Sequence, residues 1–88
     1  MQLKTTTSNL SIVGSRTDWL GLYCRAGGSG ATINIRNGLT VSDPIIFSAV
    51  VQPNTHYNYD VNYPIPMDTG LFVEINAGGV VHLTVLYE

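Results

Sequence analysis

The sequence contains very little of the chemistry that most enzymes and metalloproteins use. It has one cysteine, Cys24, and two histidines, His56 and His82. A single cysteine excludes a disulfide within the chain, and these three scattered side chains do not form the ligand cluster that a zinc site requires. No nucleophile is accompanied by a base and an orienting group. We therefore expect no enzymatic activity, no metal and no other cofactor.

Charged residues are also scarce: they make up 11% of the 88 residues, against about 25% in an average soluble domain. The basic residues Lys4, Arg16, Arg25 and Arg36 form no run, and the net charge is −2, so we expect no binding to nucleic-acid phosphates. Because a small domain has proportionally more surface than a large one, few charges remain to cover it. Either Thr, Ser, Asn and Gly make up much of the surface, or another chain covers part of it. We favour the second interpretation and predict a homo-oligomer.

No apolar stretch approaches the roughly 20 residues of a membrane helix, and the first ten residues, MQLKTTTSNL, contain no apolar run typical of a secretory signal. We expect a chain that is made and folds in a cytosol and does not enter a membrane. A chain of 88 residues has room for one domain, so we assign residues 1–88 to a single domain.

The main pattern in the sequence is an alternation of apolar and polar residues, and this period of two predicts strands. Residues 19–25, 31–36, 71–76 and 80–87 all alternate in this way. We expect Phe72 and Leu86 on outward sides. The inward sides are expected to carry Leu20, Leu22, Cys24, Ile33, Ile35, Leu71, Val73, Ile75, Val81, Leu83, Val85 and Tyr87.

Three further segments are less regular. IIFSAVV (45–51) is apolar on both sides, which predicts a strand buried on both faces. Leu10 and Ile12 indicate a weaker strand, and HYNYDVNY (56–63) is compatible with a strand or an ordered loop.

Glycine and proline separate these segments. AGGSG (26–30) predicts a turn, Asn37-Gly38 predicts a type I′ hairpin, AGG (77–79) predicts a tight hairpin, and the prolines of PIPMDTG (64–70) exclude a central strand. About seven short strands predict an all-β fold, a small antiparallel β-sandwich, with a jelly roll as candidate topology and a small barrel as the alternative.

Several short motifs have plain structural interpretations. GGSG (27–30) precedes a strand and not the helix that a phosphate-binding loop needs. Asp-Thr-Gly at 68–70 matches the tripeptide of aspartic proteases, but we interpret Asp18, Asp43 and Asp68 as turn residues that cap their own backbone. We expect Cys24 to be a small buried apolar side chain and His82 to lie on an outer face.

The segment 56–63 carries the clearest candidate binding residues, Tyr57, Tyr59 and Tyr63. Interleaved tyrosines and amides are typical of binding surfaces. Strict alternation would place Asn58, Asp60 and Asn62 on the face opposite Tyr57 and Tyr59. This favours contact with a protein over contact with a glycan. The structural alternative is that the tyrosines cover one side of a thin core.

Two segments share the same pattern of a glycine-led strand, a small-residue turn and a second strand. They are GLYCRAGGSGATINIRNG (21–38) and TGLFVEINAGGVVHLTVLYE (69–88). Over most of residues 19–88 this pattern resembles small β-rich virion structural proteins of tailed bacteriophages, of the capsid decoration or cement type. The resemblance implies a non-enzymatic virion component, favours a trimer, and suggests the major capsid protein or other virion proteins as partners, with no small-molecule substrate.

On this view the interaction surface comprises Tyr57, Tyr59, Tyr63, Phe72 and Leu86. Two other functions remain open. One is a carbohydrate-binding module on a virion surface that uses the three tyrosines with Asn58 or Asp60. The other is a tail or neck adaptor.

Overall fold

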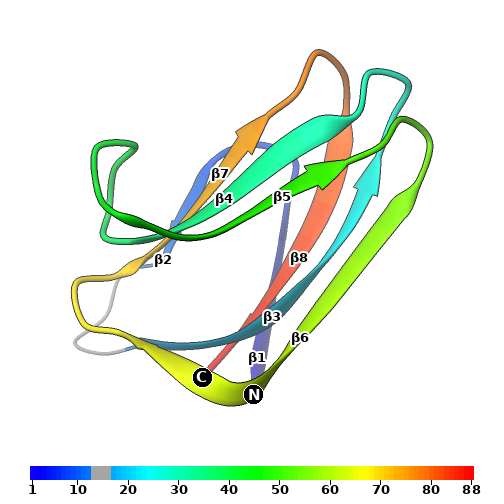
Figure 1. Ribbon diagram of the computed structural model, residues 1–88. Coiled ribbons are helices and arrows are strands. Elements are labelled where there is room, and N and C mark those ends of the chain that lie inside the picture. The colour runs from blue at the N-terminus through cyan, green and yellow to red at the C-terminus, as the bar shows by residue number, and fades with distance from the viewer. Residues whose placement is uncertain (13–16) are drawn as a thin grey trace.

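The computed structural model describes residues 1–12 and 17–88, and within these residues it contains eight strands and no helix (Figure 1). Two antiparallel sheets of four strands pack face to face. The strands are β1 (Gln2–Thr6), β2 (Leu10–Ile12), β3 (Thr17–Ala26), β4 (Ala31–Asn37), β5 (Ile45–Val51), β6 (His56–Met67), β7 (Leu71–Asn76) and β8 (Val81–Tyr87). The predicted all-β sandwich is confirmed.

The strand order is β1-β8-β3-β6 in one sheet, here called sheet A, and β2-β7-β4-β5 in the other, sheet B. Strand β1 pairs with β8, β2 with β7, β3 with β6 and β4 with β5. These pairings are nested, as in one long hairpin folded over on itself. This is the arrangement of an eight-stranded jelly roll.

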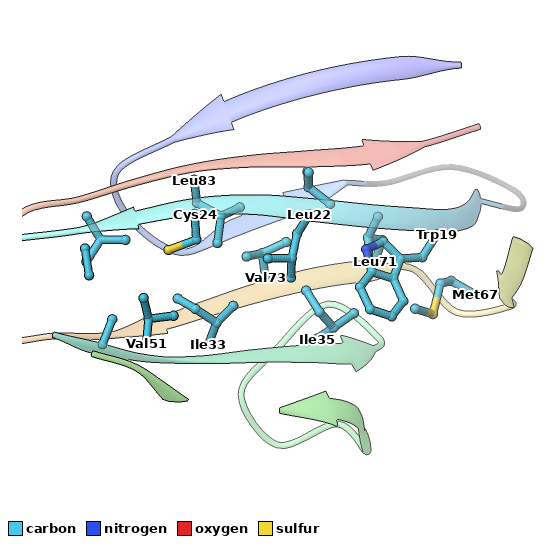
Figure 2. Packing of buried hydrophobic residues seen from close by; sticks show 14 residues of the cluster. Trp19, Leu22, Cys24, Ile33, Ile35, Val51, Met67, Leu71, Val73 and Leu83 are labelled. Atoms are coloured by element: carbon cyan, nitrogen blue, oxygen red, sulfur yellow. The ribbon is translucent and has the colours of Figure 1, made fainter. Parts of the chain in front are cut away.

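The core lies between the two sheets and is built from alternate residues of every long strand. Leu22, Leu83, Ile33 and Val73 are fully buried and meet across the gap between the sheets (Figure 2). The inward residues predicted for β4, β7 and β8 pack in or against this cluster. Cys24 is also fully buried, and burial raises the pKa of its thiol. The prediction of a small buried apolar side chain is confirmed.

The connections differ from the predicted hairpins. The segment 26–30 joins β3 of sheet A to β4 of sheet B, and 77–79 joins β7 of sheet B to β8 of sheet A. Both are therefore crossings between sheets: the predicted turn at 26–30 joins strands of different sheets, and the prediction of a tight hairpin at 77–79 is wrong. Strands β4 and β5 do form a hairpin, but its connection runs from 38 to 44 and not through a two-residue turn at Asn37-Gly38. Local turn residues do not reveal which sheet the next strand joins.

Strand β3 contains a bulge that reverses its alternation. The register between β3 and β8 shifts between Trp19 and Gly21, which leaves Leu20 as the extra residue. Trp19 is therefore buried inside the core, although the sequence placed it outside, and Leu20 is only half-buried. The indole Nε1 donates a hydrogen bond to the carbonyl oxygen of Gly21 (2.9 Å), which satisfies the one polar atom of this buried ring.

Strand β5 is an edge strand of sheet B, and the prediction that it is buried on both faces is wrong. A second bulge lies at its start, where Ile35 and Arg36 of β4 pair with Phe47 and Ile45. Both Ile45 and Ile46 are exposed, at 49% and 40%. The bulge explains why the segment does not alternate.

The weaker segments are strands. Leu10–Ile12 forms β2, and the ambiguous residues 56–63 belong to β6, an edge strand of sheet A. Pro64 and Pro66 lie in this edge strand, in agreement with the prediction that their segment is not central.

Candidate functional site

The inward tyrosines of β6 belong to an aromatic cluster on the side of the sandwich where the edges of both sheets meet. Tyr59 stacks on Phe47 of β5 with ring centroids 4.4 Å apart, and on Trp19 of β3 at 5.8 Å. Tyr57 contacts Phe47 at 6.5 Å. Both tyrosines are half-buried and pack against the core. Their aromatic faces close the side of the core, which is the structural alternative kept open above.

Alternation along β6 is confirmed. Tyr57 and Tyr59 are half-buried, whereas Asn58, Asp60 and Asn62 are exposed on the outer face. The amide and carboxylate groups thus lie on the face opposite these two tyrosines. A sugar stacked on Tyr57 or Tyr59 would not reach them.

The other three candidate residues are separated from one another. Tyr63 is 82% exposed near the proline end of β6. Phe72 lies on the outer face of sheet B as predicted, but it is only 8% exposed and has little surface to offer a partner. Leu86 is half-buried on the outer face of sheet A, directly opposite Leu3 of β1. The structure does not bring the five candidates together into one surface.

A row of cationic and titratable side chains crosses the outer face of sheet A. His82 of β8 and His56 of β6 pair in register with Arg25 of β3 from its two sides, and all three are exposed. The Tyr23 hydroxyl shares a hydrogen bond with Nδ1 of His56. No carboxylate of the described residues forms an ion pair with Arg25. His82 lies on the outer face, as expected.

A polar network lies on the outer face of sheet B. One carboxylate oxygen of Glu74, Oε1, accepts hydrogen bonds from Nε and Nη2 of Arg36 (3.0 and 2.9 Å) and from the Asn34 amide (2.9 Å). The Ser48 hydroxyl donates to Oδ1 of Asn34 (2.7 Å). The hydrogen bonds from Asn34 and Arg36 lower the pKa of Glu74. Every group is engaged within the protein, so the network joins β4, β5 and β7.

The connection from β4 to β5 is organised by Asp43. Its carboxylate accepts hydrogen bonds from the backbone amides of Leu39 (2.8 Å) and Thr40 (2.9 Å), which lower its pKa. The predicted capping role is confirmed for Asp43. Asp18 lies in β3 and not in the predicted turn.

Half of the large apolar residues that are exposed in the described part of the chain lie in this connection and in β5. Leu39, Val41, Ile45, Ile46 and Val50, which we call the apolar band, are 40% to 69% exposed. Sequence analysis missed this surface because it assigned 45–51 to the interior. A signal was present: Asp43 is the only charged residue between Arg36 and His56.

Two shallow hollows lie near the turns that join the sheets. One is lined by polar, small and aliphatic residues of 29–32, 50–53 and 76–78, none of them titratable. The other is lined by Arg25, His82, Val80 and the backbone of 26–27. Within residues 1–12 and 17–88, no three His, Cys, Asp or Glu side chains are grouped closely enough to hold a metal ion.

The described part of the chain also contains no helix that is long and apolar enough to cross a membrane. Arg16, one of the four basic residues, lies outside the described residues. Comparison with models of known protein families, with curated proteins and with solved structures yields no match to this chain.

Proposed function

We propose that this protein is a structural component of a bacteriophage particle, a capsid decoration protein that binds capsid subunits as a homo-oligomer. The observation that carries the proposal is the apolar band, because exposed apolar side chains concentrated in one connection and the strand that follows it are typical of protein-binding surfaces. The band lies on a domain with few charges, and the resemblance of 19–88 to small virion proteins supports the same assignment.

The fold is compatible with this role but does not prescribe it. Jelly rolls occur in viral capsid domains and also in lectins and cupins, so function has to be argued from the surface. The surface carries exposed apolar side chains and sheet edges with free backbone hydrogen-bonding groups. The described residues do not bring a nucleophile, a base and an orienting group together. Such a surface can bind a partner without changing it chemically.

In this proposal the protein stabilises the shell by mass action, because a molecule that binds only assembled subunits shifts the equilibrium toward assembly. Several linked copies bind together more tightly than one, so each individual contact can be small. An oligomer of a 9.5 kDa domain is suited to bridging neighbouring subunits in this way.

The glycan-binding alternative receives less support from the surface. Two of its three tyrosines, Tyr57 and Tyr59, face the core, and only Tyr63 remains available for stacking. A single exposed aromatic residue makes a poor sugar platform.

The test is a binding assay with purified protein and capsids of the encoding phage that lack it. We expect the wild type to sediment with capsids and Val41→Asp, in the apolar band, to lose binding. Val80→Asp is the matched control, because Val80 is 64% exposed but lies between β7 and β8, outside the band. Failure of the wild type to bind capsids would overturn the proposal, and binding to isolated tails would favour the adaptor alternative.

A further inference from the structure

Four strands form the outer edges of the two sheets, and three of them carry features that discourage further pairing. Exposed edges normally carry charges, prolines, bulges or very short strands, because their free backbone groups can pair with another chain. Strand β1 contains Lys4, and β2 has only three residues. Strand β6 contains Asp60, Pro64 and Pro66.

Strand β5 has almost none of these features. It has seven residues, IIFSAVV, with no charge and no proline. It pairs only with β4, so alternate backbone amides and carbonyls along its other side face away from the sheet. The bulge affects only its start, and pairing with β4 is regular from Phe47 to Val51. Figure 1 shows this strand at the margin of its sheet.

The outward side chains of β5 are close to symmetrical about Ser48. Ile46 and Val50, two residues before and after it, are 40% and 69% exposed. If two copies of β5 pair antiparallel with Ser48 opposite Ser48, Ile46 of each copy lies opposite Val50 of the other. Each exposed aliphatic side chain then meets another one. Because the strand is uncharged, pairing brings no like charges together along the strand.

We infer that β5 is the self-association edge of this protein and that its occupant is β5 of a second copy, paired antiparallel about Ser48. The inference deepens the proposed function by naming the contact that makes the oligomer. The two B sheets would become one continuous eight-stranded sheet.

The geometry limits the assembly to two copies at this contact. An isologous pairing uses the same edge on both partners, so neither edge remains free for a third. This differs from the trimer that the family resemblance suggests. The contact is small, so we expect a weak dimer that forms with rising protein concentration and dissociates on dilution.

Sedimentation or light scattering of the full chain tests the inference directly. We expect the wild type to approach twice 9.5 kDa with rising concentration, and Val50→Lys to remain monomeric. Val80→Lys, the same change at a similarly exposed valine (64%) away from β5, should still dimerise. Circular dichroism establishes that both variants are folded. A wild type that is monomeric or trimeric would overturn the inference, as would a dimeric Val50→Lys.

A cysteine cross-link tests the register. Ser48→Cys should form a covalent dimer under a mild oxidant such as diamide, because directly opposite residues of antiparallel strands lie within disulfide reach. Val80→Cys should not, and the buried Cys24 is inaccessible in both. Absence of the cross-link in a dimeric Ser48→Cys would overturn the register. A dimer that fails to bind capsids would leave this inference intact and contradict only the proposed function.

Discussion

Glu74 illustrates how this protein uses its few charged side chains. It lies on an outer sheet face, yet its side chain is only 12% exposed, and that of its partner Arg36 is 14% exposed. A poorly hydrated carboxylate is stable only when it is paired and hydrogen-bonded. Three donors meet this requirement at a single oxygen, so the pair acts as an internal connection and not as a binding group.

This arrangement makes stability depend on pH. The hydrogen bonds from Asn34 and Arg36 lower the pKa of Glu74 in the folded state. The stabilisation is therefore complete above the ordinary glutamate pKa of about 4.3 and is lost as the pH falls through the lower folded value. We expect Glu74→Gln to be less stable than the wild type at pH 7 and to lose less stability on acidification. Urea unfolding at several pH values measures this, and equal pH dependence in both proteins would contradict it.

The tyrosines of β6 should differ in their effects on stability. Tyr59→Ala removes a ring that stacks on both Trp19 and Phe47, and we expect a loss of about 3 kcal/mol in the free energy of unfolding. Tyr63→Ala removes an 82% exposed ring and should change stability by less than about 0.5 kcal/mol. Denaturant titration compares the two. Similar losses for both would show that the aromatic cluster does not close the core as described.

At the scale of single strands, the bulge of β3 depends on Gly21. This residue has a φ of 153°, and a Cβ there would overlap the carbonyl oxygen of Tyr59 on the neighbouring strand. Gly21→Ala should therefore destabilise the protein by at least about 2 kcal/mol. Gly28→Ala is the control, because a Cβ at Gly28 meets nothing within 4 Å. A neutral Gly21→Ala in thermal unfolding would contradict this account of the bulge.

The bulges of β3 and of the β4–β5 pair separate the residues whose direction the sequence predicts correctly from those it misplaces. Alternation correctly predicts the inward residues of β4, β7 and β8, because side-chain direction in a regular strand is a local property. It misplaces Trp19 and the β5 segment, because a bulge depends on the partner strand and inserts one residue without a clear local signal. Sheet membership is similarly non-local, which explains why 26–30 and 77–79 look like hairpins in the sequence.

The candidate site was only partly predictable. The alternation of Tyr57 and Tyr59 against Asn58 and Asp60 was correct, because it follows from strand geometry alone. Their role was not predictable, because the partners that bury them, Trp19 and Phe47, come from β3 and β5. The apolar band was missed for a related reason. A run of aliphatic residues gives the same sequence pattern whether it forms a central strand or an unprotected edge strand.

At the scale of the whole molecule, the nested pairing places β5 and β6, the middle of the chain, on one side of the sandwich. The termini lie close together at one end of sheet A (Figure 1). Phe47 joins the aromatic cluster from β5, so the unprotected edge and the side of the core are continuous. Covering this edge would therefore also shield the aromatic cluster that closes this side of a thin core.

This continuity predicts that stability depends on protein concentration. If two copies pair through β5, folding and association are linked, and binding at a free concentration one hundred times Kd stabilises the folded state by about 2.7 kcal/mol. The wild-type unfolding midpoint should rise with concentration in calorimetry, whereas that of Val50→Lys should stay constant because its edge cannot pair. Val80→Lys should behave as the wild type. A wild-type midpoint that does not change with concentration would show that the folded chain does not self-associate in this range, and an equal rise for Val50→Lys would place the contact away from β5.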